Sequence, residues 1–203
     1  LKGLVGPHSQ VASAREALGL SNAPATWESH QDLFSLQLSQ LAVPEALQAG
    51  RFQCRHSHKA DLDLLIQWRV AYMIEAINEK ETPALWSTSR EAIERNNSEG
   101  SLWVLLDGGR LVSMSAFNAS LPDSVQVGGV WTPPELRSRG YARCAVAGSL
   151  LEAREKGAER AILFTEDAAA RRTYLALGFR IIGDYGILQF DSPQNVRDQQ
   201  PSP

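Results

Sequence analysis

The residues from Val130 to Ala142 combine side-chain types and spacing that suit phosphate binding. An apolar run with β propensity stops at Pro133-Pro134, and a loop with Arg137 and Arg139 then leads directly into an expected helix. The first N–H groups of a helix have no partner in the helix and lie at the positive end of its dipole, so main-chain N–H groups of residues 136–142 could bind an anion. Gly140 would let the backbone approach a phosphate without a Cβ contact. Each arginine taken alone could equally be a solvated surface residue.

Size and composition limit the classes of function. The chain has 203 residues, of which 43% are hydrophobic, and this is enough for one well-buried domain with an appendage. A net charge of −3 provides no basic field, so we expect no nucleic-acid partner. No apolar run approaches the length of a membrane span and no secretory pattern opens the chain, so we expect a cytoplasmic protein without a membrane partner. The two cysteines, Cys54 and Cys144, form no metal-binding pattern, and we expect no metal.

The apolar periodicity changes near residue 50. In the first part, Gly3–Pro7 reads as a turn, a helix is expected near 11–18, and 34–39 alternates as a half-buried strand. Further on, helices are expected over 61–79, 87–96, from the loop to a stop at Lys156-Gly157, and over 167–177. Strands are expected over 52–56, 102–106, 111–117, 125–131, 161–164 and within 179–190. The residues 107–110 predict a hairpin turn. Gly128-Gly129 predicts a bulge in the strand before the loop, with a simple loop break as the alternative.

The loop and the elements after it resemble the GCN5-related N-acetyltransferase (GNAT) family. Arg137-Ser138-Arg139-Gly140-Tyr141-Ala142 fits the family's pyrophosphate loop, Gln/Arg-x-x-Gly-x-Gly/Ala, at every specified position. A helix, a strand near 161–165 and a second helix with Tyr174 and a Gly178-Phe179 ending follow in the family's order. The resemblance covers about 51–190. It implies an α/β (α+β) GNAT fold, in which a mixed, mostly antiparallel sheet is flanked by helices and splayed around the strand that holds acetyl-CoA.

The resemblance also implies a division into three parts. Residues 51–190 would form the catalytic domain, and the polar, proline-bearing residues 191–203 would form a flexible tail. Residues 1–50 would be either an N-terminal extension packed on that domain or the remnant of a degenerate GNAT copy, because some members of the family carry such a copy before the active one.

Acetyl-CoA is the cosubstrate that the resemblance implies, and it assigns roles to individual residues. Arg137, Ser138, Arg139, Gly140, Tyr141 and Ala142 would surround the pyrophosphate. The pantetheine arm would pair with the backbone of Val130, Trp131 and Thr132 as an added strand, and an N–H near Val130 would polarise the thioester carbonyl. Tyr174 matches the position that protonates the departing thiolate. Asp167 stands where many members have an asparagine that binds the pantetheine; an ionised aspartate can only accept hydrogen bonds, and the alternative is a helix cap.

The general base is less well defined by the sequence. Gln126, on the strand before the loop, cannot act as a base. Glu75, on the expected inner side of the helix over 61–79, is the leading candidate, ahead of Glu91 and Glu94. These glutamates belong to a set of acidic residues that would suit a cationic acceptor, or would form a plain exposed surface: Glu75, Glu79, Glu81, Glu91 and Glu94.

The predicted function is therefore acetyl-CoA-dependent N-acetylation of a primary amine, by direct attack without a covalent acyl-enzyme. The alternatives are a non-catalytic acyl-CoA-binding or regulatory module and a transferase for longer acyl groups. The acceptor could be a small molecule or a protein amine, and a homodimer is among the assemblies that we consider.

Overall fold

The computed structural model describes residues 1–196. The strands are β1 (Gly3–Pro7), β2 (Ala25–Gln37), β3 (Phe52–His56), β4 (Leu102–Asp107), β5 (Arg110–Ser120), β6 (Ser124–Trp131), β7 (Arg160–Thr165) and β8 (Arg180–Phe190). The α-helices are α1 (His8–Ala17), α2 (Glu45–Gln48), α3 (Leu62–Ile77), α4 (Pro83–Ser98), α5 (Tyr141–Glu155) and α6 (Ala168–Leu175). Short 3-10 turns are η1 (Leu38–Gln40), η2 (Lys59–Asp61) and η3 (Pro134–Leu136).

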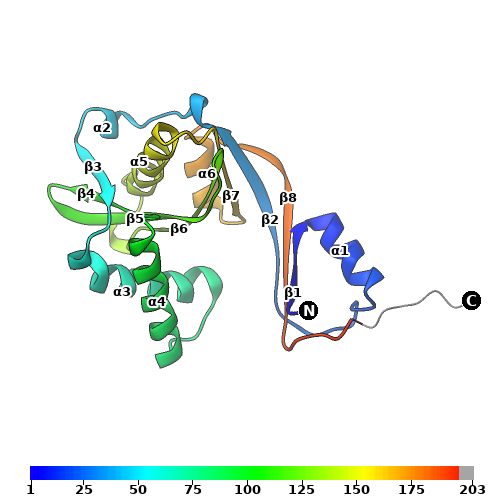
Figure 1. The fold of residues 1–203 in the computed structure, drawn as a ribbon. Helices are drawn as coiled ribbons and strands as arrows, with labels where there is room; N and C mark the ends of the chain where they lie inside the picture. The colour runs from blue at the N-terminus through cyan, green and yellow to red at the C-terminus, as the bar shows by residue number, and fades with distance from the viewer. Residues whose placement is uncertain (197–203) are drawn as a thin grey trace, which may run out of the picture. The chain divides into compact units, whose positions relative to one another are not determined.

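The strands follow the hydrogen-bonded order β1-β8-β2-β7-β6-β5-β4-β3 (Figure 1). Pairing is antiparallel between β1 and β8 and along β3, β4, β5 and β6, whereas β6 and β7 are parallel. This mixed, mostly antiparallel sheet confirms the predicted fold class.

The chain divides into two compact units. The core unit holds residues 35–163 and 171–180, and the terminal unit holds residues 1–34, 164–170 and those from 181 onward. The strand β2 has 13 residues and runs through residue 34, so the alternation expected over 34–39 begins inside β2 and ends in the turn η1. The division of the chain at residues 50 and 190 stays a prediction.

In the core unit, alternate residues of the central strands face opposite layers of helix. Val104 and Met114 pack in a cluster with α3 and α4, whereas Leu105 and Val112 pack in a cluster with α5. Figure 1 shows α5 on one side of β4, β5 and β6, and α3 and α4 on the other. This period of two fixes the register of the strands, because a slip by one residue would exchange the two faces.

The polar contacts of α5 join its last turns to the sheet. Glu152 accepts hydrogen bonds from the Trp103 indole (2.8 Å) and contacts His56 Nε2 at 2.6 Å, and Lys156 lies 2.6 Å from the same carboxylate. Burial alone would raise the pKa of Glu152, but the hydrogen bonds from Lys156, Trp103 and His56 lower it to about 2. Gly148 lets the helix approach β3 closely, because a Cβ there would overlap the Cys54 side chain.

The two helices before β4 begin in different ways. Asp61 immediately precedes α3, and its carboxylate accepts hydrogen bonds from the Arg55 guanidinium (2.7 and 3.1 Å) and the His58 N–H. Pro83 opens α4 at its first turn, and the Thr82 hydroxyl caps that turn by accepting from the Leu85 N–H (3.1 Å). The second helix therefore starts earlier than expected, because proline is favoured at the first helical position.

The terminal unit is built from β1, β8, the first part of β2 and helix α1. Gly3–Pro7 is a strand and not the predicted turn, because it pairs with Tyr185–Gln189 of β8, a partner far away in the sequence. Residues after β8 continue this contact, since the Gln194 N–H donates to the Leu1 carbonyl at 2.7 Å. The expected flexible tail thus begins with bonded residues, and its part over 197–203 lies outside the described residues. Over residues 1–196, no helix has both the length and the apolar character to cross a membrane.

Candidate functional site

The loop between β6 and α5 has a backbone that turns twice into the left-handed region. Ser138 and Gly140 have φ values of 63° and 80°, and Arg139 between them does not have a positive φ. Alternating backbone hand of this kind directs successive N–H groups to one concave side, where they can bind an anion. For Ser138, which has a Cβ, the left-handed conformation costs roughly 1–2 kcal/mol, and such strain often occurs at binding sites.

The free hydrogen-bond donors of this loop begin at Ser138. Within the described residues, the N–H groups of Ser138, Arg139 and Gly140 form no hydrogen bond, and those of the first turn of α5 have no acceptor inside the helix. The N–H groups of Leu136 and Arg137 instead donate to the carbonyls of Pro133 and Pro134. The donor set is therefore shorter than the range 136–142 considered from the sequence.

Arg137 is held by three different contacts. Its Nε donates to the Thr132 carbonyl at 3.0 Å, and its guanidinium lies over the Trp131 ring at 4.8 Å from the ring centre. Its two terminal nitrogens face the two carboxylate oxygens of Glu75 on α3, at 2.7 and 3.0 Å. The sequence placed Glu75 and Arg137 in one site, and the structure brings them together as a direct ion pair.

The edge of β6 that faces β7 is open toward its C-terminal end. Pairing with β7 covers only Ser124–Gln126, whereas pairing with β5 continues to Trp131. Beyond Gln126 the backbone groups on this edge could pair with an extended ligand, as in strand addition. The loop donors and the open edge lie at the end of one strand, and together they fit a diphosphate joined to an extended chain that carries amides.

The predicted bulge in β6 is confirmed. Met114 and Ala116 of β5 lie opposite Trp131 and Gly128, so three steps on β6 face two steps on β5. Gly129 has a φ of 56°, which explains why this position holds glycine. The bulge rotates the last residues of β6 relative to the rest of the strand.

The side chains at the end of β6 pack and form hydrogen bonds inside the protein. Trp131 and Thr132 are buried, and the Ser113 hydroxyl binds both the Trp131 carbonyl (3.0 Å) and the Thr132 hydroxyl (2.9 Å). Val130 lies between the bulge at Gly129 and the anchored Trp131, and pairing with β5 is recorded for Trp131 and Gly128 on either side of it. Sequence reasoning missed Ser113, although serines at 113 and 115 interrupt an otherwise apolar strand.

Tyr141, in the first turn of α5, points into the protein and not toward the loop. Its hydroxyl donates to the Asp107 carboxylate at 2.5 Å, and its ring meets the Phe52 ring edge to face. The hydrogen bond to Asp107 raises the pKa of Tyr141. The side chain of Tyr141 therefore does not face a ligand at the loop, and only its backbone N–H could bind an anion there. Asp107 was interpreted from the sequence as a turn residue alone, so its role as an anchor of α5 was missed.

Tyr174 and Asp167 lie at the two ends of α6. Tyr174 is buried in the core unit, with its ring edge to face against Phe179, and its carbonyl accepts the N–H groups that close the helix. Asp167 lies in the terminal unit and accepts from the Ala170 N–H at 2.6 Å. Its carboxylate thus caps α6, and its contact with a pantetheine arm stays a prediction.

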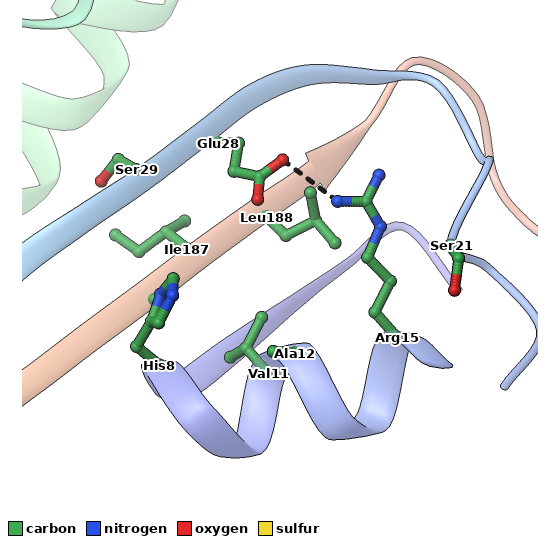
Figure 2. Close-up of a pocket in the computed structure, with 10 residues that line it drawn as sticks. His8, Val11, Ala12, Arg15, Ser21, Glu28, Ser29, Ile187 and Leu188 are labelled. Carbon is green, nitrogen blue, oxygen red and sulfur yellow. Dashed lines mark hydrogen bonds and ion pairs between the residues drawn. The ribbon is translucent and has the colours of Figure 1, made fainter. Parts of the chain in front are cut away.

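The terminal unit contains a pocket that includes none of the predicted site residues. It has a volume of about 260 Å³ and lies between α1 and β8. Figure 2 shows Val11 and Leu188 inside it and the ion pair of Arg15 with Glu28, 3.1 Å long, across one end. The candidate site is therefore the open edge and loop of the core unit and not this pocket.

A comparison with known proteins matches this chain to a family. The profile of the Acetyltransferase (GNAT) family matches residues 67–179, more than half of the chain. None of the curated proteins matches the sequence.

Solved structures share the fold at low sequence identity. A protein of Novosphingobium aromaticivorans assigned to the GNAT family has a TM-score of 0.63 and 18% identity, over 94% of this chain and 74% of that one. A GCN5-related N-acetyltransferase from Kribbella flavida has a TM-score of 0.57 and 21% identity, over 81% of this chain and 59% of that one. A predicted acetyltransferase of Clostridium acetobutylicum, solved with acetyl-CoA, has a TM-score of 0.52 and 16% identity, over 72% of this chain and 96% of that one.

Proposed function

The chain belongs to the acetyltransferase (GNAT) family and is a transferase, and we propose that it moves the acetyl group of acetyl-CoA to a primary amine by direct attack. The observation that carries the proposal is the junction of β6 with α5. There, over residues 1–196, the N–H groups of Ser138, Arg139 and Gly140 form no hydrogen bond, and they lie one short loop after a strand whose recorded pairing with β7 ends at Gln126. The acetyl-CoA in the similar Clostridium structure is consistent with this assignment.

In this proposal, the diphosphate of acetyl-CoA binds to the N–H groups of Ser138, Arg139, Gly140, Tyr141 and Ala142. The positive end of the α5 dipole and the exposed side chain of Arg139 add attraction. Because Arg137 already binds Glu75 and the Thr132 carbonyl, its main role is to stabilise the loop, and its charge contributes less to the binding of phosphate. Backbone donors therefore supply most of the specificity for a diphosphate.

The pantetheine arm pairs with the open edge of β6, along Val130, Trp131 and Thr132. We assign the polarisation of the thioester carbonyl to the N–H of Val130, which lies between the bulge and the end of β6. A donor fixed by the strand does not need to reorganise when negative charge develops on that oxygen. The hydrogen bonds of Ser113 to Trp131 and Thr132 hold this part of the strand in place.

Proton transfer needs an acid and a base. Tyr174 is the acid in this proposal: its phenol protonates the thiolate of coenzyme A as the C–S bond breaks, and Asp167 fixes the start of the helix that carries it. Glu75 is the base that takes the proton of the attacking amine. Its carboxylate is half exposed and lies on α3, within reach of solvent and of the loop through Arg137.

The test is release of coenzyme A thiol from acetyl-CoA in the presence of a panel of primary amines, with mass spectrometry of the products. Tyr174→Phe should lower kcat by roughly 100-fold or more and leave the affinity for acetyl-CoA within about twofold. Tyr185→Phe, a tyrosine of β8 stacked on Phe164 in the terminal unit, is the matched control. Turnover of Tyr174→Phe at the wild-type rate would refute the role of Tyr174 as the acid.

Binding of coenzyme A without acetylation of any amine would favour a binding module. A preference for longer thioesters would favour transfer of a different acyl group.

A further inference from the structure

Helix α3 carries a cation that the protein itself does not neutralise. Arg69 is half buried, and its Nε is buried without a hydrogen-bond partner. Over residues 1–196, no carboxylate forms an ion pair with it, and the charged group that acts on it most strongly after Tyr72 is another cation, Arg95 of α4. Burial lowers the pKa of Arg69, and Arg95 adds to that effect.

An unpaired, partly buried guanidinium is unfavourable for folding, because its desolvation is not compensated by a partner. Such groups are expected mainly where a ligand completes the interaction. The half-buried Tyr72 lies one turn further along the same helix. In the described chain the Tyr72 hydroxyl forms no hydrogen bond, and burial raises the pKa of Tyr72, so this phenol remains a donor at neutral pH.

The two groups lie next to the strand that we assign to the acetyl group. The Tyr72 ring meets the Trp131 ring edge to face, with ring centres 6.3 Å apart. Trp131 ends β6, and Arg137 covers the face of the same ring. The Tyr72 ring is therefore separated by one aromatic side chain, Trp131, from the backbone that would hold the thioester, and Arg69 lies one turn before Tyr72 on α3.

The glutamates of α3, of α4 and of the segment between them form no ion pair with Arg69 over residues 1–196. Glu75 is paired with Arg137, Glu94 lies 3.8 Å from Arg90, and Glu81 accepts from the Trp86 indole at 3.1 Å. Glu91 accepts from Ser87, and all five glutamates of the set that suggested a cationic acceptor are exposed. Arg69 thus differs from these glutamates, because it is half buried and no carboxylate of residues 1–196 pairs with it.

From these observations we propose that the amine acceptor carries an anionic group, a carboxylate or a phosphate, which Arg69 and Tyr72 bind while the amine faces the thioester. The proposal rests on the acetyl transfer proposed above and adds the class of acceptor. A guanidinium donates paired hydrogen bonds from a planar group, and a phenol donates one. Carboxylate and phosphate oxygens accept both kinds.

The experiment compares matched acceptors that differ in charge: β-alanine with β-alaninamide, and O-phosphoethanolamine with ethanolamine. For wild-type protein we expect the charged member of at least one pair to have the lower KM, and the pair that shows the difference distinguishes carboxylate from phosphate. Arg69→Met should raise the KM for the charged acceptor by roughly 10- to 100-fold. The KM values for acetyl-CoA and for the uncharged acceptors should stay within about twofold. Arg69→Lys should restore part of the loss, and Tyr72→Phe should give a smaller one.

Arg90→Met is the matched control, because Arg90 is an exposed arginine of α4 whose guanidinium lies 3.8 Å from Glu94. The melting temperature separates a binding role from a structural one. Removal of an unpaired buried charge is neutral or stabilising, so Arg69→Met should melt at the wild-type temperature or above. A lower melting temperature together with equal loss for charged and uncharged acceptors would show a structural role and overturn the proposal.

Direct binding keeps the acceptor class testable apart from the transfer reaction. Calorimetric titration of β-alanine and of O-phosphoethanolamine into protein saturated with coenzyme A should give heat that Arg69→Met abolishes. If no amine is acetylated but this heat is present and depends on Arg69, the reaction assignment fails and the anion site stands. If amines are acetylated without preference for charged members, or if neither anion binds to wild-type protein, the anion site is refuted.

Discussion

Replacement of Glu75 by glutamine separates two roles that the structure gives to one carboxylate. Glu75 is the proposed base, and it also forms the two-point ion pair with Arg137 at 2.7 and 3.0 Å. Glutamine keeps the shape of the side chain and one hydrogen-bond acceptor, but it cannot take a proton from an amine. The substitution therefore removes the base completely and the contact with Arg137 only in part.

The expected magnitudes differ enough to distinguish the two roles. The side chains of Arg137 and Glu75 are 39% and 50% exposed. A surface pair of this kind contributes about 0.2–1 kcal/mol, which corresponds to less than about a sixfold change in acetyl-CoA affinity even if loop order depends on it entirely. Loss of a positioned base lowers kcat by roughly 10²- to 10⁴-fold.

The assay is steady-state thiol release at several pH values, with acetyl-CoA and the amine varied independently. We expect Glu75→Gln to lower kcat by at least 100-fold near pH 7 and to lose this defect gradually at higher pH, where the amine deprotonates without help. Glu94→Gln is the control, because Glu94 is an exposed carboxylate of α4 near Arg90. An unchanged kcat combined with a higher KM for acetyl-CoA would refute the base role and leave Glu75 as an anchor for Arg137.

Three further outcomes follow from contacts in the core unit. Tyr141→Phe removes the hydrogen bond to Asp107 that holds the first turn of α5, so the KM for acetyl-CoA should rise by about three- to tenfold with kcat changed much less, as measured by initial rates. Gly148→Ala places a Cβ against the Cys54 side chain and should lower the free energy of unfolding by about 1–3 kcal/mol in urea titration, despite the better helix propensity of alanine. Although burial opposes its ionisation, hydrogen bonds lower the pKa of Glu152 from 4.5 to about 2, so its contribution to stability is complete above pH 4.5 and is lost as the pH falls toward 2. The melting temperature of Glu152→Gln should fall less over this range than that of wild type.

The elements that sequence reasoning located correctly are those with local signals. Gly108 and Gly109, both with positive φ, form the predicted hairpin turn, and Pro133-Pro134 ends β6 before the loop. Glycine in the left-handed region and proline without an N–H act on their immediate neighbours, so a short window of sequence is enough to recognise them.

The features that were missed depend on partners that are distant in the chain. Gly3 pairs with Gln189, and the sequence near Gly3 has no pattern that predicts so short a strand. The bond from Arg137 to Glu75 spans 62 residues, so each residue could be placed in a site but their pairing could not be foreseen. Arg69 lies within an amphipathic helix, where an arginine is ordinarily exposed, and only the burial of its Nε without a partner distinguishes it.

The most direct test of the account follows the backbone amides themselves. Coenzyme A is titrated into isotopically labelled protein, and the amide proton and nitrogen shifts are recorded for each residue. The account predicts saturable shifts that are largest for Ser138, Arg139, Gly140 and Ala142, with a second set at Val130 on the open edge of β6. Folded protein in which these amides stay unchanged while coenzyme A is added in excess would contradict the central claim.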